Sequence, residues 1–275
     1  MVIKAVIFDI GGVVVGSPVA AISRAEQLWN LPRHYLNSLI TAYGDQGAFQ
    51  RLERGELGIE EFYREFGNQL SDVERGNSAF RTYCKRVGME CPELPKELKI
   101  DGKELWSLMM DPATEPDPLV VTAINRLRAS GRYKIAALTN NFAPSSGVPQ
   151  RYRSTGSFRE ITTEELRSSL KEAAREESDS KGAGDNLLKS LFDEYIESCI
   201  EGLRKPDPRF FQLALDKLGI KPEEAVFLDD IGHNLIAARK LGIRTIRVVH
   251  GQSEKAIKEL ESVVDLRLLD EKSKL

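Results

Sequence analysis

The stretch that decides the fold is KAVIFDIGGVVVGSP, residues 4–18. It begins with a short apolar, β-branched run with little alternation, as is typical of a strand covered on both faces in a parallel sheet. The run ends in a single carboxylate, Asp9, and the chain then turns at Gly11-Gly12. Ligands of open α/β sheets bind at the carboxyl ends of the strands, so the position of Asp9 predicts a functional side chain.

Apolar runs of the same kind recur along the chain, with helical periodicity between them. The predicted strands are 2–8, 134–138, 195–199 (the weakest), 225–228 and 245–249, and the predicted helices between them are 118–129, 208–218 and 234–241. Strands that alternate with helices indicate an α/β fold with a Rossmann-like parallel sheet.

About a hundred residues separate the first two predicted strands, and much of this segment is amphipathic and helical. Helical spacing of apolar residues covers 20–29, 32–43, 59–70 and 77–86. We therefore predict a helical cap, residues 17–116, inserted after the first strand of a core formed by 1–16 and 117–275. Three prolines, Pro112, Pro116 and Pro118, mark the return to the core.

Residues 144–188 form a polar insertion in the second part of the core, poor in large apolar side chains. Within it, Thr163 followed by Glu165 is interpreted as a capping box that starts a solvated helix over 162–177. We interpret the remainder as a flexible surface insertion, with a lid or a partner-binding segment as the alternative.

Composition and charge exclude some classes of function. The formal net charge is -3, with 39 Lys+Arg and 42 Asp+Glu, which argues against a broad nucleic-acid surface. No apolar run reaches the ~18 residues of a membrane-spanning helix. Three cysteines, Cys84, Cys91 and Cys199, stand apart without CxxC spacing, which predicts reduced, buried thiols in a cytoplasmic protein.

Polar residues follow three predicted strands at the points where the strands end, and a lysine follows a fourth. These residues are Asp9, Thr139, Asn140, Asn141, Asp229 and Asp230, with Lys205 after the strand 195–199. Because the carboxyl ends of parallel strands share one edge of the sheet, we expect all seven to face one crevice.

The acidic members of this set point to phosphoryl transfer. Asp9 is the candidate nucleophile, since covalent attack would divide one difficult step into two. Asp9, Asp229 and Asp230 would repel one another as bare carboxylates, which predicts a hard, oxygen-seeking cation, most simply Mg²⁺.

The remaining members suit the binding of a phosphate group. Lys205 would balance the negative charge that a cation leaves uncompensated. The Thr139 hydroxyl and the free backbone N–H groups of Asn140 and Asn141 would hold phosphate oxygens as fixed dipoles.

In this order and at these separations, the segments resemble the four motifs of the haloacid dehalogenase (HAD) superfamily. They read VIFDIGGVV (6–14), ALTNN (137–141), GLRKPDPRFF (202–211) and VFLDDIGHNLIAARKLGI (226–243). The resemblance implies a Mg²⁺-dependent phosphomonoester hydrolase that works through an aspartyl-phosphate on Asp9. It also implies a metal site formed by Asp9, the Gly11 carbonyl and Asp230, with Asp229 supporting it directly or through water and Asn234 behind it.

A finer resemblance concerns 197–243, which is similar to the phosphatase-like N-terminal domain of soluble epoxide hydrolases and to the domain fused to acyl-CoA dehydrogenases. It implies a small-molecule phosphate ester as substrate, with lipid or isoprenoid phosphates included by analogy. In the cap, FQRLERGELG (49–58) resembles a segment that faces the substrate in capped HAD proteins. Arg51, Glu53 and Arg54 are therefore specificity candidates, with plain helix-surface charge as the alternative.

Gly11 stands where HAD phosphatases usually carry a second aspartate, the general acid and base. Such a group contributes about 10²–10⁴ in rate. The resemblance thus implies a slow phosphatase, and a catalytically reduced binding protein is the alternative. A 2-haloacid dehalogenase is disfavoured, because a metal-free site gains nothing from two extra carboxylates beside Asp9. His233 is the nearest candidate for a replacement proton carrier.

Overall fold

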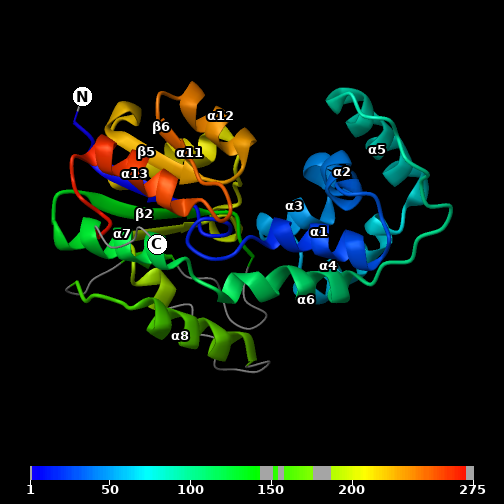
Figure 1. The fold of residues 1–275 in the computed structure, drawn as a ribbon, viewed down its shortest axis with the longest axis horizontal. Coiled ribbons are helices and arrows are strands. Elements are labelled where there is room, and N and C mark those ends of the chain that lie inside the picture. Colours follow the sequence, from blue (N-terminus) through cyan, green and yellow to red (C-terminus); the bar gives the residue numbers. More distant parts are fainter. Residues whose placement is uncertain (1, 143–150, 154–157, 176–186, 271–275) are drawn as a thin grey trace.

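The computed structural model describes residues 2–142, 151–153, 158–175 and 187–270. Five parallel strands and one antiparallel edge strand form a single sheet in the order β3-β4-β2-β1-β5-β6 (Figure 1). The strands are β1 (Ala5–Phe8), β2 (Lys134–Thr139), β3 (Tyr152–Arg153), β4 (Glu194–Glu197), β5 (Ala225–Asp229) and β6 (Arg244–Arg247). The predicted α/β fold with a parallel sheet is confirmed.

All five predicted strands occur, with shifted ends. The start of β1 lies three residues later than predicted, and at the end of β4 the chain enters α10 (Ser198–Glu201) where the sequence predicted two further strand residues. The edge strand β3 was not predicted. It has two residues, and it pairs through Tyr152 opposite Tyr195, a long-range contact that leaves no periodic pattern in the sequence.

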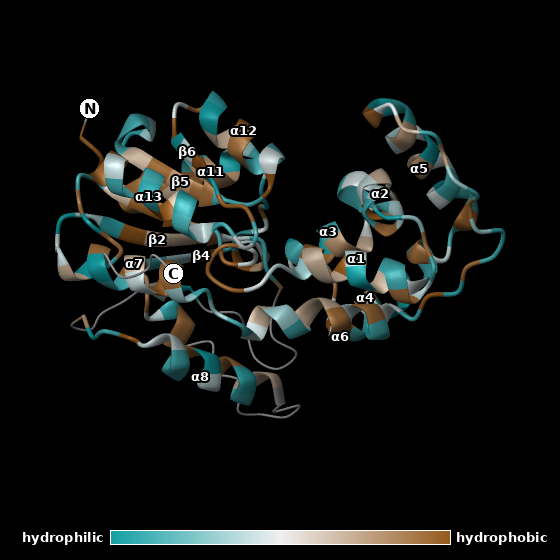
Figure 2. Cartoon of the chain, in the orientation of Figure 1, coloured by the Kyte–Doolittle hydropathy of each residue, from teal (hydrophilic) through white to brown (hydrophobic). Residues whose placement is uncertain are grey.

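Alternate residues of the central strands enter two separate hydrophobic layers. Val6 and Phe8 pack with α7 (Pro118–Ala129) and α13 (Ser253–Val264) on one face. On the other face, the strand residues between them pack with α11 (Pro208–Leu218) and α12 (Gly232–Lys240). Because helices cover both faces of these strands, their sequences lack a polar face, and Figure 2 shows them as mainly hydrophobic.

Local capping explains why α7 and α11 occur where they were predicted. Each begins with an aspartate followed by proline at the first helical position. The Asp117 carboxylate accepts hydrogen bonds from the N–H groups of Leu119 and Val120, and Asp207 accepts from Arg209 N–H. Both signals lie within a few residues of the helix start, so they can be read from the sequence.

The inserted helices have a hydrophobic core of their own, at the right in Figure 1. They are α1 (Pro18–Leu28), α2 (Tyr35–Ala42), α3 (Ala48–Glu53), α4 (Ile59–Leu70), α5 (Val73–Val87) and α6 (Gly102–Met110). The separate core supports the domain division that we propose, a cap of residues 17–116 and a core of 1–16 and 117–275. The sequence did not predict α3 or α6.

The described part of the polar insertion contains α8 (Thr163–Arg175). The capping residue is Thr162 rather than Thr163: its hydroxyl accepts from Glu165 N–H at 3.2 Å, and the Glu165 carboxylate accepts from Thr162 N–H at 2.8 Å. The helix is solvent-facing along most of its described length, as predicted, but Leu166 is buried in the core next to Ile161, which precedes the helix. Other parts of 144–188 lie outside the described residues.

Two predictions from composition can be compared with the described residues. All three cysteines are free thiols, but only Cys84 is buried. The burial prediction is wrong for Cys91, which lies in an extended, exposed segment after α5, and Cys199 is half-buried. Among the described residues, no helix has the length and apolar character needed to cross a membrane.

Candidate active site

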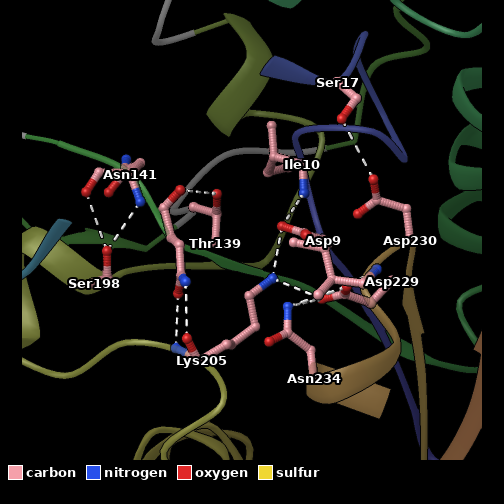
Figure 3. Close-up of polar contacts among 12 residues, drawn as sticks. Asp9, Ile10, Ser17, Thr139, Asn141, Ser198, Lys205, Asp229, Asp230 and Asn234 are labelled. Carbon is pink, nitrogen blue, oxygen red and sulfur yellow. Dashed lines mark hydrogen bonds and ion pairs between the residues drawn. The ribbon is translucent and has the colours of Figure 1, made fainter. Parts of the chain in front are cut away.

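The sheet brings three of the predicted side chains to one edge. β1 lies between β2 and β5, all parallel, so Asp9, Thr139 and Asp229 stand at neighbouring carboxyl ends. The Asp9 N–H donates to the Leu228 carbonyl at 2.9 Å, which ties the end of β1 to β5. Figure 3 shows the side chains converging there, with Lys205 approaching from another loop.

Lys205 bridges two of the carboxylates. Its Nζ lies 2.7 Å from Asp9 Oδ1 and 2.9 Å from Asp229 Oδ2, and only 1% of its side chain is exposed. Burial opposes the ammonium charge, but Asp229 and Asp9 outweigh it and raise the pKa of Lys205. For Asp9, burial dominates and raises the pKa well above its ordinary value, although Lys205 acts in the opposite direction.

Asp229 has its acceptor capacity occupied. Its Oδ1 accepts from Ile231 N–H at 2.7 Å and from Asn234 Nδ2 at 3.1 Å. Its Oδ2 accepts from Lys205 Nζ at 2.9 Å and from the same Asn234 amide at 3.0 Å. The carboxylate is completely buried, and these donors hold it in one orientation.

Asp230 differs, because its Oδ1 is buried and has no hydrogen-bond partner among the described residues. Its Oδ2 accepts a long hydrogen bond, 3.4 Å, from Ser17 Oγ. Burial, followed by the charge of Asp229, raises the pKa of Asp230 to about 6. Asp9, Asp229 and Asp230 each offer an oxygen within 4.8 Å of the others, which is a donor set that suits a hard divalent cation.

The turn after Asp9 requires only one of its two glycines. Gly12 has φ +84°, and a Cβ there would lie 2.3 Å from Asp230 Oδ2. Gly11 has no left-handed φ, and a Cβ there would meet Pro18 Cδ at 3.1 Å. The Ile10 carbonyl accepts three N–H groups of the turn, whereas no described backbone hydrogen bond ends on the Gly11 carbonyl.

The segment after β2 is tied to other loops. The Asn140 side chain accepts from Lys205 N–H at 2.7 Å and donates to the Lys205 carbonyl at 3.0 Å. Asn141 N–H donates to Ser198 Oγ at 2.9 Å, so the prediction that this N–H is free is wrong. Thr139 is buried, and its hydroxyl makes only a 3.4 Å contact with the Asn140 carbonyl.

Sequence reasoning missed Ser198 and Ser17. Ser198 Oγ accepts from Asn141 N–H and donates to the Asn141 carbonyl at 3.1 Å, which fixes the loop after β2. No sequence signal pointed to Ser198, since its partner lies 57 positions away. Ser17 immediately precedes Pro18 and α1, so its place beside a helix start was readable but its contact with Asp230 was not.

The remaining candidates are dispersed. His233 is exposed in the first turn of α12, and among the described residues it makes no hydrogen bond to the three carboxylates. Arg51 pairs with Glu65, and Arg54 pairs with Glu56, both within the cap. Glu53 alone of the three cap candidates reaches the core. A groove of 990 Å³ between α2 and α5 is lined by none of the predicted site residues.

Comparison with known proteins agrees with this geometry. Residues 3–242 match the family model of haloacid dehalogenase-like hydrolases. The chain is 32% identical over 265 residues to mouse (Mus musculus) acyl-CoA dehydrogenase family member 10, covering 96% of this chain and 19% of that protein. It is 29% identical over 270 residues to pig (Sus scrofa) bifunctional epoxide hydrolase 2, covering 98% and 40%. The chain thus spans less than half the length of both relatives.

A solved structure shows the same fold. The crystal structure of a HAD family enzyme from Bacteroides thetaiotaomicron, in a magnesium complex, aligns with a TM-score of 0.52 at 15% identity, covering 94% of this chain and 99% of that one. The family match spans both the core and the inserted helices, and it confirms the resemblance drawn from the four motifs. The chain belongs to the haloacid dehalogenase-like hydrolase family.

Proposed function

We propose that this hydrolase cleaves phosphomonoesters in a Mg²⁺-dependent reaction through an aspartyl-phosphate on Asp9. The observation that carries the proposal is the geometry of Lys205, whose ammonium group bridges Asp9 and Asp229 beside a third carboxylate with an unpartnered oxygen. A nucleophilic carboxylate must approach a phosphate of like charge, and a buried cation at this position reduces that repulsion.

Asp9 is oriented for attack by its own donors. Its Oδ1 accepts from Ile10 N–H at 2.7 Å and from Lys205 Nζ at 2.7 Å. Oδ2 accepts no described hydrogen bond, and we assign it the attack on phosphorus. Burial raises the Asp9 pKa, and Lys205 acts in the opposite direction, as a bound cation would.

The donor set fits a magnesium ion. We propose Asp9, the Gly11 carbonyl and Asp230 as direct ligands, because the Asp230 Oδ1 and the Gly11 carbonyl lack described partners. Asp229 is held by Lys205 and Ile231 N–H, so it would support the ion by its negative charge, as a ligand or through water only after releasing one of these donors. The ion would screen the charge of the phosphate and of the three carboxylates.

The phosphate oxygens are assigned to the segment after β2. The Thr139 hydroxyl and the Asn140 N–H are the proposed donors, in a position fixed by the contacts between Asn140 and Lys205. Asn141 would contribute its N–H only after giving up Ser198. By analogy with the epoxide hydrolase domains, we propose lipid or isoprenoid phosphates as the substrate class.

Gly11 favours a second candidate function, a binding protein with reduced catalysis. A side chain at this position would stand two residues after the nucleophile in the chain, and glycine offers no proton donor there. Under the phosphatase proposal, the missing side chain at Gly11 makes the second step, hydrolysis of the aspartyl-phosphate, slow.

One experiment separates the candidates. Release of nitrophenol from p-nitrophenyl phosphate is measured with Mg²⁺ and with a chelator, beside chloride release from 2-chloropropionate. Mg²⁺-dependent phosphate ester turnover supports the proposal. Binding of inorganic phosphate without turnover supports the binding protein, and metal-independent chloride release supports a dehalogenase. A panel of alkyl, lipid and isoprenoid phosphates then tests the substrate class, and cell fractionation tests the predicted cytoplasmic location.

A further inference from the structure

Among the contacts between cap and core, three come from α3, α6 and the loop after α3. Arg204 Nε donates to Glu53 Oε2 at 2.6 Å. A Cβ on Gly55 would lie 2.5 Å from the Cys199 carbonyl oxygen, so the two backbones are in close contact. The Trp106 ring meets Phe142 edge-on, with 4.6 Å between the centroids.

Each core partner in these contacts is next to a candidate site residue. Arg204 immediately precedes Lys205, and Phe142 immediately follows Asn141. Cys199 Sγ donates to Asn141 Oδ1 at 3.2 Å. The position of the cap is therefore transmitted to the two segments that carry Lys205 and the proposed phosphate donors.

The contact of Glu53 is charged and buried. Glu53 is 8% exposed, and burial raises its pKa, while Arg204 acts in the opposite direction. Removing one partner of a buried ion pair leaves an uncompensated buried charge, which strongly destabilises the fold. The similar pair of Arg51 with Glu65 also measures 2.6 Å, but it joins two cap helices and does not reach the core.

The loop that carries Lys205 is contacted from both the core and the cap. A cavity of about 500 Å³ borders this loop and is lined by cap residues Asp45 and Arg54 and by 202–204 and 206–209 of the core. From the core, the Asn140 side chain binds both backbone groups of Lys205. From the cap, Glu53 holds the adjacent residue, Arg204.

We propose that Glu53 is a positioning residue: through Arg204 it holds the backbone of Lys205, so that docking of the cap places the lysine between Asp9 and Asp229. The role of Lys205 in turnover rests on the proposed function, whereas the mechanical coupling of Glu53 to the loop does not.

Hydrogen–deuterium exchange tests the coupling without requiring activity. The backbone N–H groups of 203–205 and 207 are followed in wild type, Glu53→Gln, Arg204→Gln and the double variant, with Glu65→Gln as the matched control. Exchange in this loop should be on the order of tenfold faster in each single variant. Exchange in the double variant should be no faster than in either single variant, because both substitutions remove the same interaction. Glu53→Asp keeps the charge and should give an intermediate rate.

Turnover of p-nitrophenyl phosphate supplies the second readout. Glu53→Gln should lower kcat on the order of tenfold with little change in KM, since Lys205 acts on the reacting charges. Unchanged exchange in the loop, or equal loosening in Glu65→Gln, would overturn the inference. If wild type shows no turnover but the exchange pattern appears, the proposed function fails and the coupling stands.

Discussion

The ammonium nitrogen of Lys205 lies 2.7 Å from Oδ1 of Asp9, although 196 positions separate the two residues in the chain (205 − 9). Both side chains are almost entirely buried. A second carboxylate, that of Asp229, lies 2.9 Å from the same lysine nitrogen. One cation thus serves two carboxylates, and the predictions below depend on how the remaining negative charge is balanced.

Replacing the proposed nucleophile should abolish turnover and preserve the fold. Asp9→Asn keeps the shape of the side chain, but an amide is a poor nucleophile, so we expect a loss of at least about 10³-fold in kcat. Asp216→Asn, at an exposed position on α11, is the control and should keep the wild-type rate. Circular dichroism checks the fold. Substantial activity in the folded Asp9→Asn protein would refute the covalent mechanism.

Magnesium should stabilise the folded protein through Asp230. A ligand that binds only the native state contributes about 2.7 kcal/mol at a hundred times its Kd. Titrating Mg²⁺ into chelator-treated protein should therefore raise Tm, and Asp230→Asn should remove most of the gain. The measurement is differential scanning fluorimetry, again with Asp216→Asn as control. The same Mg²⁺ response in Asp230→Asn would place the cation elsewhere.

Without metal, Asp230 should make stability depend on pH. Its pKa is about 6 in the folded protein against an ordinary 3.8, so the folded state holds the proton more tightly. The resulting stabilisation is fully present below the unfolded pKa and is lost as pH rises through about 6. Asparagine does not titrate, so Asp230→Asn does not lose this stabilisation. The free energy of unfolding of Asp230→Asn minus that of wild type should therefore rise by about 2 kcal/mol from pH 4 to pH 7. Urea unfolding in a chelator measures it, and a pH-independent difference would contradict the shift.

Gly11 should make hydrolysis of the phosphoenzyme the slow step. With a nitrophenolate leaving group, formation of the aspartyl-phosphate needs little help from an acid, whereas its breakdown lacks the base that contributes about 10²–10⁴. Rapid-quench kinetics should show a burst followed by slow turnover. A linear time course at an ordinary rate would mean that another residue, such as His233 or a cap carboxylate, replaces the missing aspartate.

Substitutions in the turn sharpen the test of Gly11. Gly11→Asp should accelerate the slow phase, and combining it with Pro18→Ala should help further, because a Cβ at Gly11 meets Pro18 Cδ at 3.1 Å. Gly12→Ala is the contrasting variant. Its Cβ would lie 2.3 Å from Asp230 Oδ2 at φ +84°, so it should impair Mg²⁺ binding. If Gly12→Ala bound Mg²⁺ normally, Asp230 would not be a ligand.

Asn125 should anchor the polar insertion to α7. Its Nδ2 donates to the Ile161 carbonyl at 2.7 Å, and its Oδ1 accepts from Ile161 N–H at 3.2 Å. Asn125→Leu leaves the buried N–H and C=O groups of Ile161 without these partners, so the free energy of unfolding should fall by about 1–3 kcal/mol. Urea denaturation measures the loss of stability. Limited proteolysis near Ile161 is the second measurement: Asn125→Leu should increase it, and the control Asn77→Leu in the cap should leave it unchanged. Undiminished stability in Asn125→Leu would show that the insertion docks without this contact.

Local signals explain the elements that were predicted well. The helices α7 and α11 carry a capping aspartate, a proline at the first position and apolar residues at helical spacing, all within one segment. The helices α3, α6, α10 and α13 were missed. α3 has only six residues, and its buried Gln50 and Glu53 obscure an apolar face. For α6 (Gly102–Met110), no helical pattern was recognised in the sequence between 87 and the prolines that mark the return to the core.

By itself, the sequence determined which residues stand at the strand ends, because strand periodicity and turn glycines act over neighbouring residues. Asp9, Thr139 and Asp229 could therefore be assigned to one edge of a parallel sheet. Only the tertiary structure decided which donors meet which acceptors. Asn141 N–H is taken by Ser198, 57 positions away, and Glu53 meets Arg204 across 151 positions. Such pairs form when separately folded layers pack together, and their hydrogen bonds leave no periodic trace in either segment.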